Sequence, residues 1–269
     1  MILALFSALL IGVSLGLMGS GGSILTVPVL IYLVGQDEKV AIAGALCIVG
    51  AIALVSGTRA ALRHQVDWSS VVWFGLPGML GTFFGAVLGG MVASSVQLLT
   101  FVGVMAFAGV WMLWRPRVPA TGAVAVRRAA IRIVPEGLMV GTLTGFVGVG
   151  GGFLIVPALV LLGGLSMQRA VASSLVIIAM QSFTGFAKYH HVLAERNLQL
   201  DWKVLATFAG VGILGSLFGG SLGRRLDQDK LRRVFAGILL ITAAAMGTAT
   251  VHGLVRAHGA DADARSVVH

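Results

Sequence analysis

Long apolar stretches alternate with short polar connectors along almost the whole chain. The stretches cover about residues 2–34, 40–58, 71–93, 96–114, 137–163, 170–187, 204–223 and 234–251. A helix needs about 20 predominantly apolar residues to cross a bilayer, and each stretch approaches or exceeds that length. The pattern predicts an all-α integral membrane protein with about eight hydrophobic segments.

Composition and charge support this interpretation. Hydrophobic residues make up 57% of the 269 residues, charged residues only 11%, and the mean hydropathy is +0.97. Soluble domains have about 45–50% apolar and 25% charged residues, so the excess apolar surface must face lipid. The net charge of +9 reflects few acids and basic loops, which is typical of cytoplasmic connectors. We therefore expect no nucleic-acid partner.

Two further features limit the class of protein. The apolar N-terminus lacks a basic region and a cleavage site, which predicts a retained first helix instead of a removed signal. The single cysteine, Cys47, excludes an intramolecular disulfide framework and a thiolate metal cluster. We expect no cofactor and no bound metal.

The two halves of the chain are related in sequence. Residues 8–35 align with residues 137–164 without a gap, at an offset of 129 positions. An offset of 134 then aligns Asp67-Trp68 with Asp201-Trp202, and a series of glycines with another. The aligned glycines are Gly78, Gly81, Gly85 and Gly89 with Gly212, Gly215, Gly219 and Gly223. Internal duplication of this kind is typical of transporters.

The duplication predicts the organisation of the chain. We expect a first membrane repeat at 1–115, an Arg-rich cytoplasmic connector at 116–135, a second membrane repeat at 136–252 and a polar C-terminal tail at 253–269. Segments one and five are the longest, and a glycine cluster interrupts each. Their halves are short for a full crossing. We therefore expect each to enter the membrane and return, which would invert the second repeat relative to the first. The alternative is that every segment crosses once, which would leave the two repeats parallel.

The glycines fall into two kinds. Those spaced every four residues in segments three and seven are explained by close helix packing. Those at 19–22 and 148–152 are nearly contiguous, which weakens a helix and exposes backbone that lipid cannot satisfy. A helix that restarts after such a break has free N–H groups and a positive dipole end that bind anions. We expect the two breaks to meet near the midplane, with helix packing as the alternative explanation.

The candidate substrate-binding residues come from these breaks and from the sixth segment. They are Gly19, Ser20, Gly21, Gly22, Ser23, Gly148, Gly150, Gly151, Gly152, Ser173, Ser174 and Gln181. For the three polar residues of the sixth segment, cavity lining and interhelical hydrogen bonding are equal alternatives. Pro28 and Pro157 follow the breaks and are expected to kink or gate the second half-helix.

Charged residues lie at the segment ends. All ten acids fall in loops, at segment ends or in the tail, which disfavours proton coupling through carboxylates. Arg59 and its counterpart Lys188 either extend to the interface or attract anions into two vestibules. No acid, base or metal constellation is present, so we expect no catalytic residue and no enzyme, and a membrane-embedded enzyme is the less favoured alternative. A passive anion channel stays open as an alternative.

The glycine motifs resemble a known family. The pattern G-x-x-G-x-G-G-x-x-x-x-V-P occurs at 16–28 and again at 145–157, together with the run 172–175 (ASSL) and the two Asp-Trp pairs. These features are similar to the TauE/SafE sulfite exporter family. In the first repeat, Gly44-Ala45 stands where Ser173-Ser174 stand in the second, so the hydroxyls are missing there.

The resemblance implies a duplicated four-plus-four permease of the bacterial inner membrane. Its implied substrates are sulfite, other sulfur oxyanions, organosulfonates or similar small anions. The expected partners are thus a small anion and the lipid bilayer, and homo-oligomerisation is left open.

Overall fold

The computed structural model describes residues 2–19, 21–114, 130–148, 152–161, 163–223, 230, 233–234 and 236–248, and this part of the chain is helical without strands. Its elements are α1 (Ile2–Met18), α2 (Gly21–Pro28), the π-helical η1 (Val29–Leu33), α3 (Glu38–Leu62), α4 (Trp68–Ser70), the π-helical η2 (Val71–Gly75), α5 (Leu76–Met91), α6 (Ser94–Trp114), α7 (Ala130–Val147), α8 (Gly152–Leu161), α9 (Met167–Glu195) and α10 (Trp202–Gly223). An apolar helix at Ala236–Thr248 follows.

These helices account for the eight apolar stretches of the sequence. Four of the described helices are long and apolar enough to cross a membrane, and four shorter apolar helices accompany them. The carboxylates of Asp67 and Asp201 accept hydrogen bonds from backbone N–H groups at the starts of α4 and α10. These bonds satisfy donors that a helix start leaves without partners. The all-helical membrane class predicted from the sequence is confirmed.

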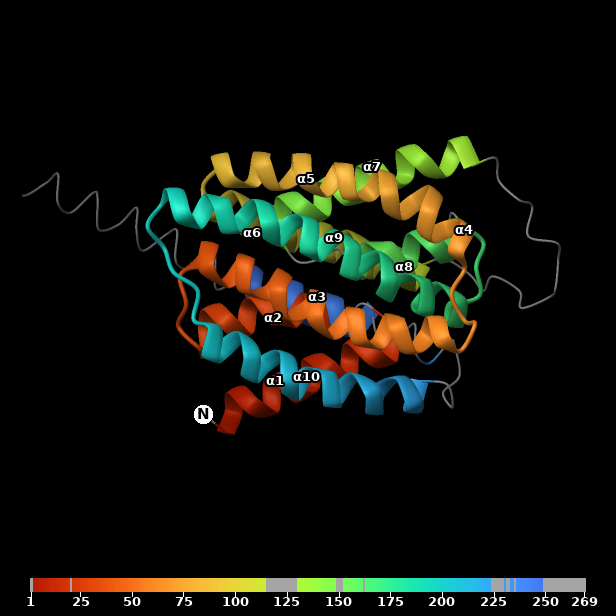
Figure 1. Ribbon diagram of the computed structural model, residues 1–269, viewed down its shortest axis with the longest axis horizontal. Coiled ribbons are helices and arrows are strands. Elements are labelled where there is room, and N and C mark those ends of the chain that lie inside the picture. Colours follow the sequence, from red (N-terminus) through yellow and green to blue (C-terminus); the bar gives the residue numbers. More distant parts are fainter. Residues whose placement is uncertain are drawn as a thin grey trace, which may run out of the picture.

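The helices pack as pairs around a central pair (Figure 1). α3 and α9 lie antiparallel at the centre, because Gly57 of α3 packs against Val176 and Gly50 packs against Ser182. α10 packs against α1 on one side, and α5 packs against α7 on the other. Each outer pair therefore combines a helix from the first half of the chain with one from the second half.

Glycine allows the outer pairs to approach closely. At four positions of α1 and α7, a Cβ would overlap backbone of the partner helix. The pairs are Gly12 with Gly212, Gly16 with Ser216, Gly141 with Gly78 and Gly145 with Thr82. Lipid removes the hydrophobic force between helices, so van der Waals packing of this kind holds them together.

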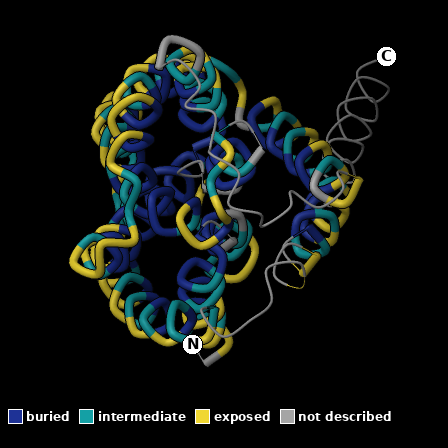
Figure 2. The backbone as a smooth tube through the Cα atoms, turned by 90° about the vertical axis from the view of Figure 1, so that its right-hand side faces the viewer, coloured by how far each residue is buried: buried dark blue, intermediate teal, exposed yellow. Residues whose placement is uncertain are grey.

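The outer surface carries the large apolar side chains. Phe84, Leu214 and Ile241 are 59%, 68% and 72% exposed. Figure 2 shows the buried residues on the inward faces of the helices and the exposed ones around the outside. Water would disfavour such a surface, whereas lipid accommodates it. The fold is that of a multi-pass membrane protein.

Both glycine clusters interrupt a helix. α1 ends at Met18, and Gly19 has a φ of +71°; α7 ends at Val147, and Gly148 has a φ of +75°. Residues with a Cβ rarely adopt this conformation. After the first break α2 turns back along α1, because Gly22 packs against Ile11 and Leu15. The chain therefore reverses its direction after the first break.

The close packing of α10 on α1 predicts a position-dependent effect of one methyl group. We expect Gly219→Ala to destabilise the protein by about 1–3 kcal/mol, because its Cβ would overlap the Val13 carbonyl. Gly210→Ala, on the same helix, meets nothing within 4 Å and should be neutral or stabilising. Thermal unfolding of both variants in detergent measures the difference. Equal melting temperatures would contradict the packing argument.

Candidate functional site

A cavity of about 480 Å³ opens at the end of the bundle where α3 finishes and α9 begins. This volume falls within the range of ligand pockets, roughly 300–1,000 Å³. Its walls come from α1, α3, α9, α10 and the connectors that follow α3 and precede α9. The polar side chains that line it are Ser56, Arg59, Arg63, His64, Gln65, Ser166, Gln168, Arg169 and Ser216.

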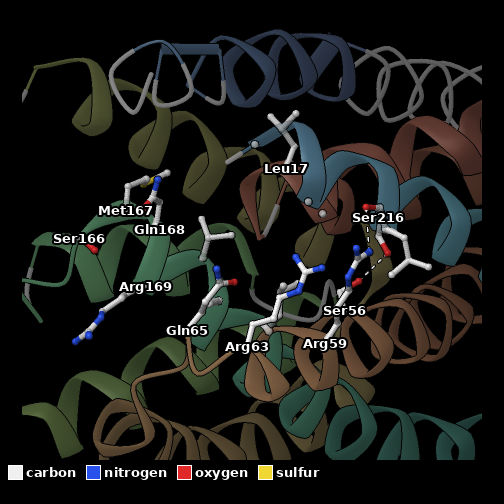
Figure 3. A pocket seen from close by; sticks show the side chains of 18 of the residues that line it. Leu17, Ser56, Arg59, Arg63, Gln65, Ser166, Met167, Gln168, Arg169 and Ser216 are labelled. Atoms are coloured by element: carbon white, nitrogen blue, oxygen red, sulfur yellow. Dashed lines mark hydrogen bonds between the residues drawn. The ribbon is translucent and has the colours of Figure 1, made fainter. Parts of the chain in front are cut away.

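The cavity is basic. Arg59 lies in the last turn of α3 and Arg63 caps the end of that helix. Their side chains extend side by side into the cavity, whereas Arg169 points away from them (Figure 3). No acidic residue is among its described lining residues, and neither Arg59 nor Arg63 forms an ion pair within the described part of the chain. Guanidinium groups bind oxyanions through paired N–H donors. The cavity is therefore suited to an anion.

Hydrogen bonds hold the inner wall of the cavity in place. The hydroxyls of Ser56 on α3 and Ser216 on α10 lie 2.7 Å apart. Arg59 donates from Nη1 to the carbonyl of Leu217, with an N–O distance of 3.4 Å. That long bond uses one of the five donors of the guanidinium, so the others stay available to a ligand.

The first glycine break lies beside this cavity. Gly16 and Leu17, just before the break, line the cavity, as does Val171 of α9. A Cβ on Gly19 would contact both Val171 and the Ser174 hydroxyl. Ser174 Oγ donates to the carbonyl oxygens of Val171 and Gly19, at 2.8 and 3.3 Å. The break is therefore attached to the first turns of α9.

The second break lies at the opposite end of the α3–α9 pair. A Cβ on Gly148 would contact Ile42, in the first turns of α3. Since α3 and α9 are antiparallel, the first turns of the two helices lie far apart. The expectation that both breaks meet near the midplane is therefore wrong: α2 and α8 contact each other, but the breaks themselves are separated.

Several predicted site residues bind other parts of the protein. Ser173 Oγ accepts a hydrogen bond from the backbone N–H of Asp67 at 2.8 Å. Ser174 Oγ donates to the carbonyls of Val171 and Gly19. Ser23 is fully buried, and Gly21 and Gly152 are the first residues of α2 and α8. Ser20, Gly150 and Gly151 lie outside the described residues.

The structure also gives the positions of the two prolines and of the two charges predicted to lie in the vestibules. Pro28 ends α2 and is followed directly by the π-helical η1, whereas Pro157 lies inside α8. Arg59 lines the cavity. Lys188 lies toward the other end of α9 and is half-buried. The cavity therefore contains one member of the predicted charge pair.

Gln181 differs from the serines. It lies in the middle of α9 and is fully buried, and neither polar atom of its side-chain amide has a hydrogen-bond partner among the described residues. Its amide nitrogen occupies the space that a Cβ of residue 78 would take, so glycine at 78 makes room for it. The neighbouring Ser182 hydroxyl is also buried and unpartnered. Buried polar groups without partners are costly, which is a mark of functional positions.

Sequence reasoning did not identify the other cavity residues. Of the basic residues that line the cavity, the sequence patterns single out Arg59 alone, and they give Arg63, Gln168 and Arg169 no role in binding. Arg59 and Arg63 are four residues apart on one helix, a spacing that places both on one face. That spacing could have indicated a basic face, but the contribution of Gln168 and Arg169 in the first turn of α9 depends on how the two halves pack.

Comparison with known proteins agrees with this architecture. Residues 4–246 match the family model described as Sulfite exporter TauE/SafE. A probable membrane transporter protein of Xylella fastidiosa (strain 9a5c) is 35% identical over 250 residues, covering 91% of this chain and 93% of the relative. Probable membrane transporter proteins of Bacillus subtilis (YunE) and Haemophilus influenzae are 26% and 24% identical; they cover 88% and 90% of this chain, and 92% and 96% of their own lengths.

No solved structure matches the chain significantly. The family match spans nearly every described helix, and the relatives are matched over almost their whole length. The chain belongs to the TauE/SafE sulfite exporter family of membrane transporters.

Proposed function

We propose that this transporter is a carrier for a small anion, namely sulfite, another sulfur oxyanion or an organosulfonate. The observation that carries the proposal is the basic cavity, in which Arg59 and Arg63 lie side by side and no described lining residue carries a carboxylate. Arginines in a partly dehydrated recess attract anions and bind their oxygens in pairs. The sulfur-containing class is taken from the family description.

The route inward starts at this cavity. The anion would pass from the arginines to the backbone around Gly19 and the N-terminus of α2, which adjoin the cavity wall through Val171. Helix N-termini stabilise anions without a fixed positive charge. Gln181, with two unpartnered amide atoms in the bundle centre, would then provide hydrogen bonds deeper in the membrane. The serines at 173 and 174 would position this backbone and not bind the anion directly.

We further propose that two inverted repeats form the protein, with the first at 1–115, the second at 136–252, the connector at 116–135 and the tail at 253–269. The antiparallel α3–α9 pair supports inversion, because these helices are equivalent at an offset of 129. The exchanged outer pairs support it as well: Gly12 packs on Gly212, and its equivalent Gly141 packs on the equivalent Gly78. Movement between the repeats would alternate access to the anion.

A passive anion channel is the second candidate. A channel and a carrier can have the same lining and differ only in whether both ends open together. The chain supports the carrier, because the cavity opens at one end of the α3–α9 pair while the described residues at the other end are packed. Family membership in a group of transporters leaves no support for the enzyme alternative.

The first test is anion flux in proteoliposomes with sulfite, thiosulfate, a small sulfonate and acetate. We expect saturable uptake of a sulfur anion, accelerated by the same anion on the other side, because a carrier must reorient its site. Flux that rises linearly with concentration and shows no counterflow would indicate the channel. Flux of acetate alone would reject the sulfur assignment.

The second test concerns the cavity arginines. We expect Arg63→Gln to reduce the apparent affinity for the transported anion roughly tenfold, since a charge-assisted hydrogen bond is lost. The defect should increase at low salt, where screening is weak. Lys203→Gln, an exposed cation at the start of α10 and away from the cavity, is the matched control. Equal defects in both variants would show only a general effect of net charge.

The third test separates function from stability at Gln181. We expect Gln181→Leu to lower the transport rate roughly tenfold without lowering the melting temperature, because it removes amide atoms that bond to no described part of the chain. Thr184→Val on the same helix is the control, since the Thr184 hydroxyl donates a local hydrogen bond to the Met180 carbonyl of its own helix. A destabilised Gln181→Leu protein with normal transport would assign the amide a structural role.

A further inference from the structure

A buried polar cluster joins the helices at the end of the bundle opposite the cavity. Lys39 of α3 is 2% exposed, and its Nζ donates to the carbonyl of Gly89 at 2.7 Å and to the side-chain oxygen of Gln97. Gln97 Nε2 donates to the Tyr189 hydroxyl at 2.6 Å and to the Phe146 carbonyl. Tyr189 is fully buried. We call Lys39, Gln97 and Tyr189 the polar latch.

The polar latch connects the two halves of the chain. Lys39 lies on α3 and Gln97 on α6, both in the first half, whereas Tyr189 lies on α9 in the second half. Tyr189 also donates to the Phe146 carbonyl of α7, with an O–O distance of 3.1 Å. The carbonyl of Val92 accepts a further bond from Lys39 at 3.2 Å. Separation of the halves at this end would have to break these bonds.

The repeat offsets place the polar latch at the position equivalent to the cavity. At an offset of 129, Tyr189 corresponds to Ala60, Lys39 to Gln168 and Phe146 to Leu17. At an offset of 134, Gly89 corresponds to Gly223. Ala60, Gln168, Leu17 and Gly223 all line the open cavity. The same part of the fold is therefore open in one repeat and filled in the other.

Side-chain size and hydrogen bonding explain the difference. Alanine at 60 leaves the space that a tyrosine ring fills at 189. Gly89 is packed so closely against the Tyr189 hydroxyl, Gln97 and the Phe146 carbonyl that a Cβ would not fit. Gln168 is exposed in the cavity, whereas Lys39 is buried with three acceptors around its ammonium. The end of the bundle around Lys39 is therefore closed by specific hydrogen bonds and side-chain contacts.

The acceptors of the polar latch are all uncharged. The Lys39 ammonium bonds to two backbone carbonyls and one amide oxygen, and no carboxylate is among these acceptors. Water can replace such acceptors at little net cost, because hydrogen bonds lost in the protein are regained with solvent. An anion that reached Lys39 would compete strongly with neutral acceptors for it. The cluster is therefore suited to opening.

We propose that the polar latch is the closed gate of a second vestibule, and that transport requires Lys39, Gln97 and Tyr189 to separate so that Lys39 faces the anion. This inference rests on the proposed carrier function. In the alternate state Lys39 supplies the positive charge at this end that Arg59 and Arg63 supply at the other. The gate then opens only when the halves of the chain move apart around α3 and α9.

A matched pair of cysteines tests the gate. Ala172 lines the open cavity and keeps 5% of its surface exposed, and its equivalent at offset 129, Ala43, is fully buried on the closed side. In a Cys47→Ala background, which removes the only native cysteine, Ala172→Cys or Ala43→Cys is reacted with a small charged methanethiosulfonate. We expect rapid modification at 172 and slow modification at 43 in the purified protein.

Opening the gate should change only one of these rates. We expect Tyr189→Ala to raise the modification rate of Ala43→Cys roughly tenfold or more, because it removes both the ring and its hydrogen bonds. The rate at Ala172→Cys should stay within about twofold, since that cavity is already open. If Tyr189→Ala does not fold, Gln97→Leu removes the central bonds of the cluster and should act in the same direction.

The outcomes separate the gate from the transport proposal. Labelling needs no substrate, so a change at Ala43→Cys with no measurable sulfur-anion flux would support the gate and reject the substrate class. Equal labelling of Ala43→Cys and Ala172→Cys in the parent background would overturn the gate. So would an Ala43→Cys rate that neither Tyr189→Ala nor Gln97→Leu changes. Tyr189→Phe keeps the ring and loses the bonds, and we expect an intermediate rate from it.

Discussion

A bilayer offers its proteins neither water for backbone hydrogen bonds nor a hydrophobic force between helices, and most of this structure follows from that constraint. Glycine compensates for the missing hydrophobic force, because it lets helix backbones come into van der Waals contact. Gly12 and Gly16 of α1 lie directly against α10, and Gly141 and Gly145 of α7 lie directly against α5 in the same way. These contacts link the first half of the chain to the second. They leave α3 and α9 facing each other at the centre, where the transport pathway is proposed to run.

The same constraint decides where a helix can be interrupted. The break at Gly19 is tolerated because α9 covers it: Ser174 donates a hydrogen bond to its carbonyl, and Val171 packs beside it. The break at Gly148 is covered by Ile42 of α3. Each break therefore depends on a helix from the other half of the chain. The backbone at a break can reach a ligand where the break adjoins a cavity. The first break does so, because it lies beside the cavity that contains Arg59 and Arg63.

Buried polar groups separate structural from functional positions in this bundle. Most are paired within the protein: Ser173 bonds to the Asp67 N–H, Ser56 to Ser216, and the Lys39 ammonium to carbonyls and Gln97. Gln181 and Ser182 are not paired. Pairing fixes the arrangement of helices, whereas unpaired groups in a dry interior cost free energy that only a ligand or a second conformation would recover. In the proposed transport cycle, the paired cluster around Lys39 closes one end of the pathway, and the unpaired amide of Gln181 binds the anion inside it.

Local sequence determined the helices and their interruptions. Apolar runs, Asp-Trp starts and contiguous glycines act within a few residues, so segment positions, the membrane class and the breaks at Gly19 and Gly148 could be predicted. The relation between the halves was also visible, because it is a property of aligned residues. The sequence did not show that the breaks lie at opposite ends, that Arg63 and Arg169 share a cavity, or that Tyr189 fills the space equivalent to Ala60. Those facts depend on which helix packs against which, and in a membrane that choice is made by close backbone contacts between residues far apart in the chain.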